Sequence, residues 1–255
     1  MTSIVMVSLS LSLLLAVSST ANAAELKVFC THALTPALEK LGPGFETATG
    51  NKLVVIDSTS GAAVKRIQSG EVADVALLTG AAIRNLAKQG KLDSASVIDI
   101  GSTGIAVGVR AGAPKPDISS VAAFKQTLLS VKSLAYSDPA DGAASGIHIN
   151  KVLERLGLAD QLRPKITLVG GGGAVGPLAA SGAVEMVVQM ESELRASPGV
   201  TVVGPLPAEL QDLTLFSAAV FVGSKNIAGA NSLIQMLKSP KSAPLLEATG
   251  MQLPK

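Results

Sequence analysis

The chain has 255 residues, enough for one large domain or two lobes of ordinary size, and its formal net charge is only +2. Basic residues are scattered singly, and the chain has five Phe, one Tyr and no Trp. The dense basic surface and stacking aromatics of a nucleic-acid-binding protein are therefore missing, and that class is excluded.

The N-terminus has the pattern of a secretory signal peptide. An apolar run from Ile4 to Val17 precedes Ala21-Asn22-Ala23, an A-x-A cleavage site, so residues 1–23 are expected to be removed. The run is short for a membrane span, and no later segment reaches about 18 uninterrupted apolar residues. The mature protein is expected to be soluble, located in the periplasm and without stable membrane insertion, with an uncleaved anchor as the alternative.

After the cleavage site, strand and helix patterns alternate. Strands are expected at residues 25–31, 52–59 and 72–80, and helices at 34–49, 62–70 and 81–90. Helices of about 10–15 residues between apolar strands predict a parallel sheet covered on both faces.

A similar unit follows an extended segment at residues 103–114, where Pro114 and Pro116 mark a break. Its expected strands are residues 133–139, 165–169, 183–189 and 214–223, and its expected helices are residues 121–129, 147–157, 174–182 and, at the C-terminus, 230–250. The last strand and the helices after it are expected to return to the first unit.

Two such units predict an α/β protein with two lobes around a cleft. Ligands of these folds bind beyond the carboxyl ends of strands, at helix N-termini. Small or hydroxyl residues follow strand ends at 31–35, 58–62, 141–146 and 170–174. Because their amide groups are uncovered and the helix dipoles add positive potential, we expect an anion site between the lobes.

A family resemblance is carried by three segments, "LKVFCTHALTPALEKLGPGFETATG", "STSGAAVKRIQSGEVADVALLTG" and "LAYSDPADGAASGIHINKVLERLGL". From Leu26 to Gly250 the chain resembles the periplasmic molybdate-binding protein family. The resemblance implies a type II periplasmic-binding-protein fold, in which two lobes, each a mostly parallel sheet flanked by helices, hold an oxyanion between them. It places lobe 1 at residues 24–107 and 220–255 and lobe 2 at residues 108–219.

The same resemblance implies where the ligand is held. The implied ligand-binding residues are Thr31, His32, Ala33, Ser60, Gly61, Ala144, Ser145, Gly171, Gly172, Gly173 and Gln189. The family uses a Ser hydroxyl at the position of Ala33 and a Tyr hydroxyl at that of Gln189. Losing two hydroxyls that bind a desolvated dianion is unfavourable, so an organic di- or tricarboxylate is favoured over molybdate.

Two functions remain open on this scaffold. A monomeric receptor would capture a small anion and pass it to an ABC-type permease. The alternative is an aconitate isomerase, since the altered ligand site resembles that branch, whose members interconvert trans- and cis-aconitate by an allylic proton shift. In that case His32 is the tentative catalytic base. Otherwise His32 contacts the ligand, or lies at the rim and caps the next helix.

The single cysteine lies two residues before His32. Cys30 has no partner for an intramolecular disulfide and is expected to be a buried small hydrophobe, with a free thiol as the alternative. A structural zinc site needs about four ligands, and only the distant His148 is left to join this pair. Neither a metal nor another cofactor is expected.

Overall fold

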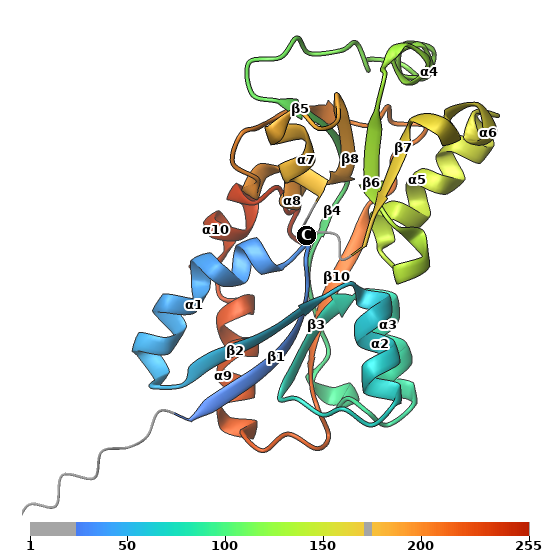
Figure 1. Cartoon of the computed structure of the whole chain (residues 1–255). Helices are drawn as coiled ribbons and strands as arrows, with labels where there is room; N and C mark the ends of the chain where they lie inside the picture. Colours follow the sequence, from blue (N-terminus) through green and yellow to red (C-terminus); the bar gives the residue numbers. More distant parts are fainter. Residues whose placement is uncertain (1–23, 171–174, 255) are drawn as a thin grey trace, which may run out of the picture.

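The computed structural model describes residues 24–170 and 175–254, and these form two α/β lobes (Figure 1). The expected signal peptide, residues 1–23, lies outside the described residues. The first lobe contains β1 (Glu25–Thr31), α1 (Thr35–Thr49), β2 (Lys52–Ser58), α2 (Ser60–Gln68), β3 (Val75–Thr79), α3 (Gly80–Lys88), β4 (Ile98–Thr103), β10 (Thr214–Val220), α9 (Ile227–Lys238) and α10 (Ala243–Ala248). The second lobe contains β5 (Ile105–Arg110), α4 (Val121–Ser130), β6 (Leu134–Ser137), α5 (Ala144–Arg155), α6 (Ala159–Leu162), β7 (Ile166–Val169), α7 (Val175–Ser181), β8 (Met186–Met190), α8 (Glu191–Ala196) and β9 (Val200–Pro205).

Each lobe is built on a five-stranded sheet, in the order β2-β1-β3-β10-β4 in the first lobe and β7-β6-β8-β5-β9 in the second. β1 is parallel to β2 and β3, while β10 is antiparallel to both of its neighbours. The second sheet repeats this arrangement around β6 and β5. The prediction of two α/β lobes with mostly parallel sheets is confirmed, because β10 in the first sheet and β5 in the second are the only members of these sheets that run against the others.

Helices cover both faces of the first sheet. In Figure 1, α1 and α9 lie on one side of it and α2 and α3 on the other. The last strand, β10, and the helices α9 and α10 belong to this lobe, as the sequence predicts.

The chain crosses between the sheets earlier than the resemblance implies. Residues 105–107 belong to β5 of the second sheet and residues 214–219 to β10 of the first, so the boundaries at 107/108 and 219/220 are displaced. The first crossing is at Gly104, directly between β4 and β5. There the side chain of Gln211, from the second crossing segment, donates from Nε2 to Ile105 O at 2.8 Å and accepts from Ile105 N at 2.9 Å. A Cβ at Gly104 would lie 2.9 Å from that amide, so a larger residue here would require the Gln211 side chain to shift.

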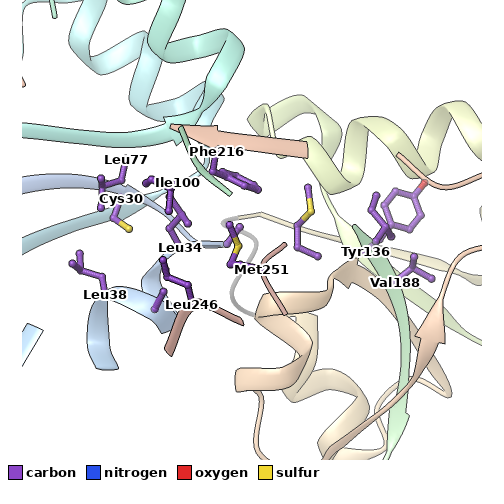
Figure 2. Close-up of a cluster of buried hydrophobic side chains, with 14 of the residues drawn as sticks. Cys30, Leu34, Leu38, Leu77, Ile100, Tyr136, Val188, Phe216, Leu246 and Met251 are labelled. Carbon is purple, nitrogen blue, oxygen red and sulfur yellow. The ribbon is translucent and has the colours of Figure 1, made fainter. Parts of the chain in front are cut away.

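The largest apolar cluster continues from one lobe into the other. Figure 2 shows Phe216 and Met251 between Cys30 and Leu77 of the first lobe and Tyr136 of the second. Cys30 is fully buried, and burial raises the pKa of its thiol to about 12 although a hydrogen bond from Thr35 opposes this. The expectation of a buried cysteine is confirmed, and at neutral pH it is an unreactive thiol.

A buried carboxylate joins three parts of the first lobe. Asp74, just before β3, accepts hydrogen bonds from Lys27 N at 2.8 Å and Ser224 Oγ at 2.7 Å. The backbone N–H groups of Lys225 and Asn226 also donate to it, both at 3.0 Å. Burial raises the pKa of Asp74, but these four donors outweigh burial and leave the pKa below its ordinary value of 3.8.

We expect Asp74→Ala to lower the free energy of unfolding by about 3 kcal/mol, because four donors lose a charged acceptor. Urea unfolding measures this change in the free energy of unfolding.

The stabilisation by Asp74 also depends on pH. Because the folded pKa is depressed, the contribution of Asp74 is present above the pKa of the unfolded chain and is lost as pH falls through the lower folded pKa. Asp117→Ala is the matched control, because Asp117 is exposed and its carboxylate accepts from Ser119 of its own turn rather than from distant parts of the lobe. Equal effects of the two variants would contradict the prediction.

Candidate functional site

A small cavity lies where the two lobes meet. Its volume is about 20 Å³, which is room for roughly one water molecule. It is lined by Thr31, His32, Ala33, Thr59, Ser137, Ala143, Ala144, Ser145, Met190, Glu193 and Phe216. The first lobe contributes the ends of β1 and β2 and the start of β10, and the second contributes the end of β6, the start of α5 and the β8–α8 junction.

The first lobe supplies a histidine–carboxylate pair. His32 follows β1, and its backbone N–H donates to Ser58 O at 3.2 Å, which prolongs the β1–β2 ladder. Its Nδ1 lies 2.9 Å from Oδ2 of Asp57, an ion-pair distance without the linear geometry of a full hydrogen bond. The other oxygen of Asp57 accepts from Thr35 Oγ1 at 2.7 Å. Asp57 is therefore held in place from a second side.

These contacts shift both pKa values away from their ordinary range. Burial alone lowers the pKa of His32, but the contact with Asp57 and the charges of Asp57 and Glu193 outweigh burial, and the net shift is upward. Burial raises the pKa of Asp57, yet His32 and Thr35 outweigh it and the net shift is downward. Because an ionised Asp57 faces Nδ1, the favoured neutral tautomer carries its hydrogen on Nδ1 and a lone pair on Nε2. Nε2 is buried and has no hydrogen-bond partner within residues 24–170 and 175–254.

The second lobe places a carboxyl group on the same cavity. Glu193 lies in α8 with 9% of its surface exposed, and Gln189 Nε2 donates to its Oε1 at 2.9 Å. Burial raises the pKa of Glu193 to about 7, and Asp57 adds to the rise while His32 and Gln189 oppose it. At neutral pH this carboxyl therefore exists in both its protonated and its ionised form.

Polar groups opposite the histidine belong to the β6–α5 junction. Ser137 ends β6 and is 1% exposed, and its Oγ has no hydrogen-bond partner in the described part of the chain. Ala144 and Ser145 begin the twelve-residue helix α5, whose positive dipole end faces the cavity. A Cβ at Gly146 would lie 2.0 Å from Ser137 O, so glycine allows the helix to start against the strand end. Together these groups can hold an anion.

The lobes touch directly beside the cavity. Thr59 Oγ1 donates to Asp141 O, and Gly61 N donates to Gly142 O at 3.3 Å. A Cβ on Gly61 would lie only 2.6 Å from Gly142 Cα. This contact closes one side of the site and depends on two glycines meeting backbone to backbone.

The sequence-predicted ligand residues fall into three groups. Five line the cavity, namely Thr31, His32, Ala33, Ala144 and Ser145. Ser60, Gly61 and Gln189 do not line it. Ser60 Oγ accepts from Thr79 N at 3.1 Å, Gly61 N donates to Gly142 O, and Gln189 Nε2 donates to Glu193 Oε1. The remaining three, Gly171, Gly172 and Gly173, lie outside the described residues. That these residues bind a ligand stays a prediction.

Three polar residues of the site, Asp57, Ser137 and Glu193, were not identified from the sequence. Asp57 and Ser137 sit on strand ends, where a polar residue in an apolar run is a detectable signal. Glu193 gave no such signal, because "MESELR" has the composition of an exposed helix. His148, the other histidine, is not part of the site, since its Nε2 lies 2.7 Å from Leu210 O.

Residues 24–170 and 175–254 contain neither a cluster of metal-ligating side chains nor a helix that could span a membrane. No group of three or more His, Cys, Asp or Glu side chains there is arranged to hold a metal ion. No helix in those ranges is long and apolar enough to cross a bilayer.

Comparison with known proteins places the chain in a family. Residues 26–252 match the model of the bacterial extracellular solute-binding proteins. The chain belongs to this family. Its members are extracellular or periplasmic, and related binding proteins serve ABC importers and bind small anions.

Named relatives cover nearly the whole chain. An aconitate isomerase from a Pseudomonas species is 35% identical over 254 residues, which is 96% of this chain and 95% of that protein. The molybdate-binding protein ModA of Escherichia coli K12 is 24% identical over 246 residues, with the same coverages. The periplasmic molybdate-binding protein of Azotobacter vinelandii superposes with a TM-score of 0.76 at 23% identity, over 90% of this chain and 100% of that one. The resemblance to molybdate-binding proteins is thereby confirmed, and the last comparison shows the type II fold.

Proposed function

We propose that this protein is an isomerase of the aconitate type, which interconverts trans- and cis-aconitate by moving a proton across the allylic carbons. The observation that carries the proposal is the His32–Asp57 pair, at 2.9 Å, whose imidazole lines the interlobe cavity together with Glu193. A receptor needs donors for its anion, but it does not need an imidazole paired with a carboxylate beside a second carboxyl group whose pKa is raised to about 7. The 35% identity to an aconitate isomerase supports the same choice.

The carboxylates of the substrate have donors in the second lobe. The N–H groups at the start of α5 and the buried hydroxyl of Ser137 point to an anion at this wall of the cavity. Glu193 lies on the same cavity, and in its ionised form it would repel any anion held there, so anion binding favours its protonated form. A longer tricarboxylate can keep its charged ends on the α5 side and its carbon chain near His32.

His32 then acts as the base. With hydrogen on Nδ1, the lone pair of Nε2 takes a proton from the methylene carbon of aconitate. The electron pair left behind spreads over the allylic carbons and the adjoining carboxylate. A proton added at the far allylic carbon moves the double bond by one position, so the substrate and product have the same atoms. Asp57 stabilises the imidazolium that forms.

The lobes have to separate for the substrate to enter. The present cavity of about 20 Å³ is smaller than any tricarboxylate. The contacts between Thr59 and Asp141 and between Gly61 and Gly142 would break on opening and form again around the substrate. Closure would exclude water from the reacting carbons and strengthen the contacts to the carboxylates.

The test is proton NMR of trans-aconitate with the purified protein in heavy water at neutral pH, with heat-unfolded protein as the control. We expect the vinyl signal of cis-aconitate to appear. Line-broadening without product would replace the proposal with a carboxylate receptor of the kind common in this family. No effect on the spectrum would overturn both functions and return molybdate and other oxyanions to consideration.

A further inference from the structure

A buried carboxyl group faces the same cavity as the histidine. Glu193 is the third residue of α8, and both it and His32 line the interlobe cavity and an adjoining outer cavity of about 190 Å³. The two residues come from different lobes, since β1 belongs to the first and α8 to the second. Closing the lobes therefore brings them to one place.

The surroundings of Glu193 bear on where its proton lies. Gln189 Nε2 donates to Oε1 at 2.9 Å, and this contact favours the acid proton on the other oxygen, Oε2. Two charged groups act on Glu193, namely His32 and Asp57, and Glu39 also lines the outer cavity. The charge of Asp57 disfavours ionisation of Glu193 and that of His32 favours it, while burial is the largest cause of the raised pKa. The protonated acid is therefore well populated when the substrate binds.

We propose that Glu193 is a second catalytic residue, which delivers the proton to the far allylic carbon while His32 removes the proton from the methylene carbon. This inference rests on the proposed isomerase function. In the forward step the methylene C–H bond breaks and its proton goes to Nε2 of His32. The Oε2–H bond of Glu193 breaks and a C–H bond forms at the other end of the allylic system.

The step leaves His32 protonated and Glu193 ionised. That state is the starting state of the reverse reaction, so one pair of residues serves both directions. Gln189 is then a positioning residue, because its amide holds the carboxyl group of Glu193. This gives a role to a position where the molybdate-binding family is expected to have a tyrosine.

A structural role for Glu193 has to be separated from a catalytic one. The side chain also accepts from the backbone N–H of Met190, the residue that caps α8, so its loss can loosen this helix. The variant Glu193→Gln keeps the size and the acceptor oxygen of the side chain but has no acid proton. Glu191→Gln is the matched control, since Glu191 lies in the same helix and pairs with Arg195 instead.

The experiment follows trans-aconitate in heavy water and measures two rates, isomerisation and hydrogen exchange at the methylene carbon. For Glu193→Gln we expect isomerisation to fall by about 10²–10³-fold, KM to stay within about threefold, and exchange to persist near the wild-type rate. Exchange persists because His32 still removes the proton and returns a deuteron to the same carbon. Glu191→Gln should change neither rate.

Three outcomes overturn parts of this account in different ways. If both rates fall together in Glu193→Gln, the residue is structural. If neither falls, it takes no part in proton transfer. If the wild-type protein itself makes no cis-aconitate, the proposed function fails, which is distinct from a failure of the role of Glu193.

Discussion

Replacing His32 by Gln should abolish most turnover of aconitate while leaving its binding largely intact. The amide nitrogen of Gln approximates the position of Nε2, but it has no basic lone pair that can accept a proton from carbon. Loss of general base catalysis typically costs about 10²–10⁴-fold in kcat, so we expect about 10³-fold, with KM changed by less than about tenfold. Steady-state kinetics by NMR measures both constants.

The matched control is the same substitution at the other histidine. His148→Gln should leave kcat unchanged, because His148 contacts Leu210 O at 2.7 Å and does not line the cavity. Loss of activity in both variants would show that the effect is not specific to the site. Unchanged kcat in His32→Gln would remove His32 from the reaction.

The pH profile gives an independent measure of the same role. The pKa of His32 is raised by Asp57 and Glu193, so the basic form appears only as pH rises through a value above the ordinary 6.5. The rising limb of kcat/KM should therefore lie above pH 6.5 in the wild-type protein. Asp57→Asn removes one of the charges that hold the pKa up, and the limb should move to lower pH. A limb that stays in place would mean that it reports another group.

Gly61→Ala should weaken substrate binding by preventing full closure of the lobes. A Cβ at residue 61 would lie 2.6 Å from Gly142 Cα and 3.2 Å from Asp141 O, and backbone atoms cannot turn aside as a side chain can. The hydrogen bonds from Thr59 and Gly61 would be lost with the contact. At about 1 kcal/mol for each of the two bonds, we expect kcat/KM to fall by roughly tenfold or more.

Gly44→Ala is the matched control, because a Cβ at residue 44 would have nothing within 4 Å of it. Small-angle X-ray scattering with trans-aconitate should show a larger radius of gyration for Gly61→Ala than for the wild-type protein and Gly44→Ala. The free energy of unfolding should change little, since the contact joins two lobes rather than holding one together. Wild-type kinetics and scattering in Gly61→Ala would mean that the glycine contact has no part in closure.

Periodic apolar patterns predicted most elements of this fold, whereas they did not locate the two positions where the chain crosses between the lobes. Residues 98–110 form an almost continuous β-rich run, interrupted only by Gly104, so nothing in the sequence marks where the chain leaves one sheet for the other. The strands β4 and β9 were missed for a related reason. Each lies next to a crossing and pairs with a strand far away in sequence, and local patterning does not reveal such pairing.

The site was predictable only where backbone geometry determines it. The strand end at Thr31 and the helix start at Ala144 follow from the βα pattern, and both line the cavity. Asp57 and Glu193 depend on how β2 pairs with β1 and how α8 packs against α1, and this is a tertiary property. Ser60 shows the opposite case, since its position at a helix start favoured a ligand contact while its hydroxyl accepts from Thr79 instead.

The position of Cys30 has a consequence for how the protein folds under oxidising and reducing conditions. It is the only cysteine of the chain and is fully enclosed by the first lobe, so no covalent cross-link contributes to the fold. An oxidising compartment and a reducing one should therefore give the same folded molecule, and its folding does not depend on the machinery of oxidative folding. The buried sulfur also serves as a natural reporter, because a thiol reagent can reach it only when the first lobe opens.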